Sequence, residues 1–331
     1  MMNQTLLMEF SLMGFTESQM LLRLHTVVFS LIYLVAMMEN LIIILLTVLD
    51  QRLHSPMYFF LRHLSLVDLC LISATLPKSI LNSITFSDFI SFLGCVLQLF
   101  CVVLLSGSEI GILTAMSYDR YIAICHPLHY EGVMSKGVCV QLMTISWLNG
   151  EVLGILCSSG TFSFNFCEST KIHQFFCDVP ALLKLSCSKE YATINVCVAI
   201  GVCYAFSCLV CIVISYVYIF TTVLKIPTRQ KQSRAFSTCL PHLIVVSTFL
   251  LTGAIAYLKP VSDEPSLLDL FVSVFYSVVP PTLNPVIYCL RSKDIKSALG
   301  KILNLYICIP PKLSTSMTFY HLSYDGNLIL I

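Results

Sequence analysis

The chain has 331 residues, of which 57% are hydrophobic and only 11% are charged. A water-soluble domain carries about 25% charged residues, so this composition excludes an ordinary soluble protein and indicates a membrane protein. The formal net charge is +1, which excludes a basic surface that would bind nucleic acid.

Seven apolar stretches are each long enough to cross a bilayer, whose hydrocarbon core needs about 20 residues per helix. The sequence therefore predicts an all-α membrane protein, a seven-transmembrane helix bundle. A short cytoplasmic amphipathic helix, about Ser292–Lys301, is expected after the last span. The predicted spans are His25–Leu49, Met57–Leu81, Leu93–Tyr118, Val138–Gly160, Ile194–Leu224, Ala235–Leu258 and Leu267–Leu290.

The distribution of basic residues predicts the orientation. Most of the 19 Lys and Arg residues fall on the cytoplasmic side if the N-terminus is outside. Residues 1–24 are then extracellular, 25–290 form the membrane domain, and 291–331 are cytoplasmic. The first span starts too late and runs too long for a cleaved signal peptide, so a multi-pass plasma membrane protein is expected.

The third span ends in MSYDRYIAICHPLHY, Met116–Tyr130. Judged by charge and position alone, Arg120 is an arginine that reaches the headgroups, with Asp119 neutralising it. Its neighbours favour a more specific interpretation, because four further motifs occur in the expected order. These are LHSPMYFFL (Leu53–Leu61), the pair Ser215–Tyr216, SRAFSTCLPH (Ser233–His242) and PTLNPVIYCLRS (Pro281–Ser292).

Together these motifs resemble the olfactory receptors, within the rhodopsin-like (class A) G-protein-coupled receptors, from about Phe10 to Lys301. The resemblance implies an odorant receptor, not an enzyme. It would bind a small, neutral, volatile apolar ligand and activate a heterotrimeric stimulatory G protein to raise cyclic AMP. A non-olfactory class A receptor for a small lipid-like ligand is the alternative. No HExxH or GxGD motif of an intramembrane enzyme is present.

The resemblance also implies a switch in which Arg120 exchanges its neighbouring acid for the G protein. A guanidinium carries five donors and stays charged, which suits such an exchange. The basic run Lys225–Arg234 either joins this G-protein surface or binds anionic membrane lipid, and both interpretations stay open. The implied switch residues are Asp119, Arg120, Tyr121, Tyr216, Asn284, Pro285 and Tyr288.

Polar side chains recur inside the predicted spans, where ionisable groups are costly and seldom face lipid. The resemblance implies that Asn40, Asp68, Glu109 and Asn284 form one cluster. Two neighbouring carboxylates would bind sodium or share a proton; the alternative is structural hydrogen bonding between helices. Glu39 stands where the family usually has glycine, and it needs a partner or a proton. No other cofactor is expected.

Four cysteines lie on the predicted outer face and would form two disulfides, with three connectivities to choose from. The resemblance implies the bridges Cys95–Cys177 and Cys167–Cys187. An oxidised Cys177 disfavours a metal site with His173 and Asp178. Asn3 begins a glycosylation sequon, Asn3-Gln4-Thr5, on the same side.

By resemblance, a ligand pocket lies between the third, fifth, sixth and seventh helices. It has no acid or base, and a few hydroxyls interrupt its apolar lining. Gly107 and Gly201 are small, so facing backbones can approach there or leave room for ligand. Two departures from the family are Leu250-Leu251, where Tyr-Gly is usual, and the tail Asn304–Ile331. The implied lining is Val102, Val103, Ser106, Gly107, Ile200, Gly201, Tyr204, Leu250, Ala254, Tyr257, Val274 and Ser277.

Overall fold

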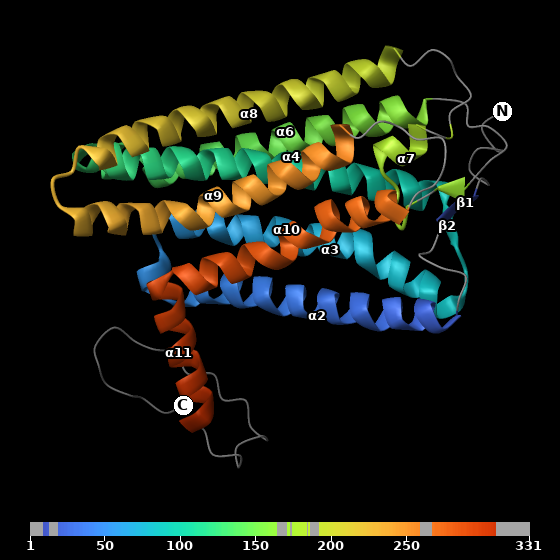
Figure 1. The fold of residues 1–331 in the computed structure, drawn as a ribbon, viewed down its shortest axis with the longest axis horizontal. Helices are drawn as coiled ribbons and strands as arrows, with labels where there is room; N and C mark the ends of the chain where they lie inside the picture. Colours follow the sequence, from blue (N-terminus) through green and yellow to red (C-terminus); the bar gives the residue numbers. More distant parts are fainter. Residues whose placement is uncertain are drawn as a thin grey trace, which may run out of the picture.

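A computed structural model describes residues 9–12, 19–163, 171–172, 174–183, 185, 192–258 and 267–308. Long helices run along one common direction (Figure 1), and seven of them are long and apolar enough to span a membrane. The helices are α2 (Gln19–Leu49), α3 (Pro56–Thr85), α4 (Phe92–Cys125), α5 (Tyr130–Val133), α6 (Lys136–Phe162), α7 (Val179–Leu183), α8 (Ala192–Leu224), α9 (Arg229–Leu258), α10 (Leu267–Arg291) and α11 (Lys293–Cys308).

The prediction of a seven-helix membrane bundle is confirmed. Each predicted span lies inside one helix, and the helices extend a few residues further. The largest extension is at α4, which continues from Tyr118 to Cys125. Asp119 and Arg120 therefore lie on the last turns of a continuous helix.

Local sequence explains several helix ends. Ser91 caps α4 by accepting a hydrogen bond from the Gly94 N–H at 3.1 Å. Pro56 occupies the first turn of α3, where its missing N–H costs nothing. The same helix ends at Phe86, which has a left-handed backbone with φ of 52°.

The helix that follows α10 is longer than predicted and leaves the bundle at an angle (Figure 1). Ser292 is the one non-helical residue between the two helices, and its hydroxyl oxygen accepts a hydrogen bond from the Ile295 N–H at 3.2 Å. The Tyr58 hydroxyl of α3 donates to Asp294 at 3.0 Å, and Ile295 is buried. One face of α11 is thus fixed to the bundle.

Glycines bring α4 and α6 into close contact. Gly107 and Gly111 lie four residues apart on α4, and Gly150 and Gly154 are spaced likewise on α6. A Cβ atom at Gly150 would lie 2.3 Å from the Leu104 carbonyl oxygen. Small residues at this spacing let membrane helices pack backbone to backbone, so α4 and α6 form a closely packed pair.

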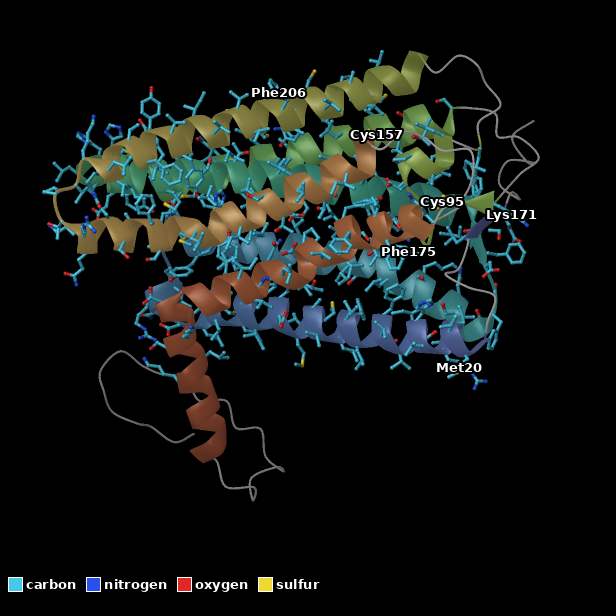
Figure 2. The ribbon with its side chains drawn as sticks, viewed as in Figure 1. Met20, Cys95, Cys157, Lys171, Phe175 and Phe206 are labelled. Carbon is cyan, nitrogen blue, oxygen red and sulfur yellow. A yellow bond between two sulfur atoms is a disulfide. The ribbon has the colours of Figure 1, made fainter. Side chains whose placement is uncertain are left out.

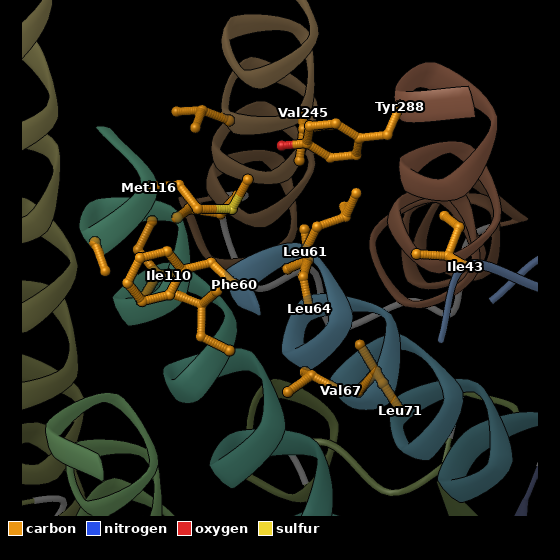
Figure 3. Close-up of a cluster of buried hydrophobic side chains, with 14 of the residues drawn as sticks. Ile43, Phe60, Leu61, Leu64, Val67, Leu71, Ile110, Met116, Val245 and Tyr288 are labelled. Carbon is orange, nitrogen blue, oxygen red and sulfur yellow. The ribbon is translucent and has the colours of Figure 1, made fainter. Parts of the chain in front are cut away.

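The main apolar core lies between α2, α3, α4, α8, α9 and α10. Figure 3 shows Tyr288 reaching from α10 toward Val245 of α9, above Leu61 and Leu64 of α3. The Tyr288 hydroxyl is buried and has no hydrogen-bond partner among the described residues. This core runs along the bundle and includes Phe175 and Phe176, which directly precede Cys177.

A small three-stranded sheet covers one end of the bundle, and the sequence reading did not anticipate it. Strand β1 (Glu9–Leu12) pairs antiparallel with β2 (Phe89–Ser91) and parallel with β3 (Lys171–Ile172). Phe10 is fully buried and packs in one cluster with Cys95 and Cys177. Such short strands, paired across long stretches of chain, leave little periodic signal. We call this the disulfide end, and the opposite end the Arg120 end.

Candidate functional site

A cavity of about 390 Å³ opens between the helices in the half of the bundle nearer the disulfide end. Figure 2 shows Cys95, Cys157 and Phe175 toward that end. Residues of α4, α6, α8 and α9 form the walls, and Val179 of α7 and Tyr276 of α10 also contribute. None of the described lining residues is an acid, a lysine, an arginine or a histidine.

Eight of the twelve pocket residues implied by the resemblance lie around this cavity. They are Val102, Val103, Ser106, Gly107, Gly201, Tyr204, Leu250 and Ala254. The helical turn of about 100° per residue brings further residues of the same helices into the wall. Those that the sequence reading missed include Ile110, Leu153, Cys157, Val198 and Thr252.

The remaining four residues are not among the described residues that line the cavity. Ile200 lies on the outer side of α8 and is 42% exposed. Ser277 is buried and donates to the Ser273 carbonyl of its own helix at 2.7 Å. Val274 packs against the main core, and the Tyr257 side chain lies outside the described structure. On α10, Tyr276 contributes to the wall instead.

Gly107 shows the first of the two expected roles, a close approach of the facing backbone. It borders the cavity, but a Cβ atom there would lie 3.1 Å from the Gly150 Cα and 3.2 Å from Leu153. Its missing side chain therefore makes room for α6, not for a ligand. Gly201 fits the second role, room for a ligand, because a Cβ atom there meets nothing within 4 Å in the described structure.

Hydrogen bonds tie the cavity wall to its neighbours. The Tyr204 hydroxyl donates to the Gly107 carbonyl at 3.2 Å, which links α8 to α4. The Tyr276 hydroxyl donates to Asp178, whose other oxygen accepts from the Val179 N–H at 2.8 Å. Asp178 is fully buried, so this carboxylate joins α7 and α10 beside the cavity.

The segment before α7 covers the disulfide end of the cavity. The predicted bridge Cys95–Cys177 is present and fixes this segment to the start of α4. The Cys177 N–H also donates to the Gln98 side chain at 2.8 Å. Cys167, Cys187, His173 and Asn3 lie outside the described residues, so the second bridge and the sequon stay predictions.

Toward the middle of the bundle lies a polar cluster formed by Asp68, Glu109 and Asn284. The Asn284 side-chain N–H donates to both Asp68 oxygens, at 3.1 and 3.3 Å, and to Glu109 at 3.2 Å. All three side chains are at most 2% exposed. One Glu109 oxygen has no hydrogen-bond partner among the described residues. Two carboxylates so close together need a shared proton or a cation to stay buried.

Asn40 does not join this cluster directly. Its amide donates to the carbonyls of Ala36 at 2.9 Å and Pro281 at 3.0 Å. Glu39 lies partly buried beside it, with one oxygen unpaired in the described structure. Within the described residues, no group of three or more His, Cys, Asp or Glu side chains is placed to hold a metal ion.

At the Arg120 end, Asp119 holds the arginine in place. Arg120 contacts one Asp119 oxygen through Nη2 at 2.6 Å and Nε at 3.0 Å. The Tyr130 hydroxyl donates to the other oxygen at 2.7 Å. Burial and this bond raise the pKa of the Tyr130 hydroxyl, which therefore remains a donor at neutral pH. Sequence reasoning missed Tyr130, although it ends the motif that contains Arg120.

The other implied switch residues do not contact Arg120 as one group but make separate contacts. Tyr121 bonds to His126 at 3.1 Å, and Tyr288 lies in the main core. Tyr216 of α8 bonds to His242 Nδ1 of α9 at 2.8 Å, and His242 Nε2 lies 2.9 Å from the Leu113 carbonyl. Because a carbonyl only accepts, Nε2 donates, and the neutral ring accepts the Tyr216 hydroxyl. His242, a second missed residue, thus links α4, α8 and α9.

Comparison with known proteins places this arrangement in a family. The sequence profile described as olfactory receptor matches residues 29–305. Human olfactory receptor 14K1 is 73% identical over 303 residues, which are 92% of this chain and 96% of that protein. Human olfactory receptor 14A16 is 52% identical, over 92% of this chain and 98% of that protein.

The fold agrees with this match. The crystal structure of squid rhodopsin superposes with a TM-score of 0.71 at 15% identity, and the match covers 88% of this chain and 87% of that one. At 15% identity, the structural similarity supports the fold assignment alone. The profile and the close relatives carry the family, so this chain is a member of the olfactory receptor family, a multi-pass membrane receptor of the G-protein-coupled type and not an enzyme.

Proposed function

We propose that this receptor binds small, neutral, volatile apolar odorants in the cavity between α4, α6, α8 and α9. The observation that carries the proposal is the lining, which has hydroxyl and thiol groups but no carboxylate, amine, guanidinium or imidazole among its described residues. A buried ion would lack a counter-charge there, at a large cost. Ser106 supplies a hydroxyl donor for a ligand oxygen. The Tyr204 and Thr252 hydroxyls donate to backbone carbonyls, so toward a ligand they act as acceptors.

Binding leads, in this proposal, to activation of a heterotrimeric stimulatory G protein and a rise in cyclic AMP. Arg120 is the contact for that protein and is released from Asp119 when α9 moves outward. The single His242 ring that bridges α4, α8 and α9 supports a shared rearrangement of these helices. Tyr121, Asn284, Pro285 and Tyr288 complete the switch.

The orientation belongs to the same proposal. The disulfide end, with residues 1–24, lies outside the cell, and the Arg120 end, with residues 291–331, lies in the cytoplasm. The Lys and Arg residues of the sequence support this placement. The membrane domain is then 25–290, and sodium is the candidate ion for the Asp68 and Glu109 pair.

A screen of volatiles tests the function. Cells that display the receptor at the surface are exposed to neutral and charged volatiles of matched size, and cyclic AMP is recorded. The expected result is a response to some neutral apolar compounds that is absent from cells expressing Arg120→Ala at equal surface density. Responses confined to charged ligands would contradict the assigned cavity chemistry.

A further inference from the structure

One wall of the cavity is also part of the outer surface of the bundle. Val202 and Phe206 of α8 line the cavity, yet they are 56% and 62% exposed. Ala254 of α9 lines it too and is exposed. Figure 2 shows Phe206 on α8 at the margin of the bundle. The cavity therefore reaches the surface between α8 and α9.

Small residues keep this opening wide. A Cβ atom built at Gly201 or at Gly253 meets nothing within 4 Å in the described structure. These two glycines lie on α8 and α9, and both line the cavity. The two helices thus face each other here without interlocking side chains, in contrast to the tight glycine contact between α4 and α6.

Where the cavity meets the disulfide end, by contrast, the residues that cover it are buried. Cys177, Asp178 and Val179 are at most 3% exposed. The disulfide to Cys95 and the bond from Tyr276 to Asp178 hold this cover on α4 and α10. In the described part of the chain, a ligand coming from that end must displace packed and hydrogen-bonded residues.

The opening lies on two helices that are long and apolar enough to span a membrane. Val202 and Phe206 lie within the candidate span Val196–Leu224, and Ala254 lies within Arg229–Ala256. Apolar molecules concentrate in a bilayer, because each CH₂ group moved out of water is stabilised by about 0.8 kcal/mol. The opening is lined by apolar and small side chains, which suits a molecule that has already left water.

We propose that apolar ligands reach the cavity from the bilayer, through a side opening between α8 and α9 bounded by Gly201, Val202, Phe206, Gly253 and Ala254. The ligand class rests on the proposed function; the route rests on the exposed cavity wall. Rotation of the exposed Val202 and Phe206 side chains, a motion that surface residues make within nanoseconds, would widen the opening. The cover at the disulfide end stays closed.

The test uses an aliphatic diazirine of about ten heavy atoms, close to the size of an efficiently bound small ligand. The purified full-length receptor is reconstituted in phospholipid vesicles, mixed with the probe and illuminated after short and long delays. Peptide mass spectrometry then reads the label on the cavity side of α4, around Val103 and Ser106. Label on lipid-facing residues of α2 serves as the internal reference.

Three variants separate the routes. Ala254→Trp narrows the opening and should lower the early cavity label at least several-fold, with the late label less affected. Phe206→Ala widens the opening and should speed labelling, which keeps the test valid if the tryptophan variant folds poorly. Val213→Trp introduces the same side chain at a 51% exposed position of α8 that does not line the cavity, and should change nothing.

Two results would overturn the route. One is that the cavity residues stay unlabelled in wild type, or are labelled at the same rate in all three variants. The other is faster labelling only when the cover is loosened by Tyr276→Phe, which would place the route at the disulfide end. A wild-type receptor that labels as expected but raises no cyclic AMP with any volatile would instead count against the proposed function.

Discussion

The Asn40 side chain of α2 donates to the Pro281 carbonyl of α10 at 3.0 Å. Pro285 lies four residues after Pro281 and has no N–H, so that carbonyl lacks its normal helical donor. Asn40 supplies the missing hydrogen bond from another helix. A proline that would otherwise weaken a membrane helix is thereby compatible with a buried, satisfied backbone.

Replacing this asparagine should destabilise the receptor. Asn40→Ala leaves the Pro281 carbonyl without a donor, at a cost of roughly 1–3 kcal/mol for a buried unsatisfied group. Thermal unfolding of purified receptor in detergent should show a lower midpoint. Thr47→Ala is the matched control, because Thr47 is also buried on α2 but bonds only within its own helix. Equal midpoints for the two variants would contradict the role given to Asn40.

The contacts of Asp119 predict opposite effects at two neighbouring positions. Arg120→Ala should abolish the agonist-evoked cyclic AMP signal with surface expression intact. Tyr130→Phe removes one of the bonds that hold Asp119, worth roughly 0.5–1.5 kcal/mol. Arg120 is then released more easily, and basal cyclic AMP should rise up to about tenfold. Tyr118→Phe, at an exposed position one residue before Asp119, should leave both signals unchanged.

The cover at the disulfide end should be needed for export to the cell surface. Cys95→Ser and Cys177→Ser each break the bridge to α4 and should retain the receptor inside the cell. Phe10→Ala should act in the same direction but more weakly, since it removes a fully buried ring from the same cluster. Glu9→Gln is the control, because it alters an exposed neighbour of Phe10 on the same strand. Surface staining of unpermeabilised cells measures the amount of exported receptor. Normal staining of both serine variants would count against the bridge as a folding requirement.

The carboxylate pair predicts a sodium effect on the resting receptor. If sodium binds between Asp68 and Glu109, raising its concentration at constant ionic strength should lower basal signalling in wild type. Asp68→Asn and Glu109→Gln each remove one charge and should lose this response. Replacing sodium with the larger choline ion controls for ionic strength. Identical responses in all three proteins would leave only the structural role for the cluster.

The sequence predicted features with a local or periodic signature. Span length and apolar content located each of the membrane helices in the described part of the chain, and the resemblance selected Cys95–Cys177. Features that depend on partners distant in sequence escaped it. The strand that contains Phe10, the bridge made by His242 and the bond from Tyr130 to Asp119 all join segments that only the fold brings together. For Gly107 and Gly201 the sequence left two roles open, because a glycine alone does not say whether a neighbouring helix or a ligand occupies the space of its missing side chain.

The two cavity glycines give a matched pair of substitutions. Gly201→Val adds three carbons toward open space in the described structure. Against a ligand of about ten heavy atoms, with at most about 1.5 kcal/mol gained per atom, losing the contacts of a few atoms should abolish a weak response. Surface expression and thermal stability should stay near wild type, because no neighbour lies within contact distance.

Gly107→Val adds the same atoms but should fail for another reason. Its side chain would press against the Gly150 backbone, so α4 and α6 must separate, and expression and stability should fall. Ser106→Ala, one residue away, keeps the packing and should weaken only oxygen-bearing agonists, by up to about tenfold for a bond worth roughly 0.5–1.5 kcal/mol. Concentration–response curves at matched surface density separate these cases. Unchanged potency in Gly201→Val would show that agonists bind elsewhere, whereas stable, well-expressed Gly107→Val would contradict the close packing of α4 on α6.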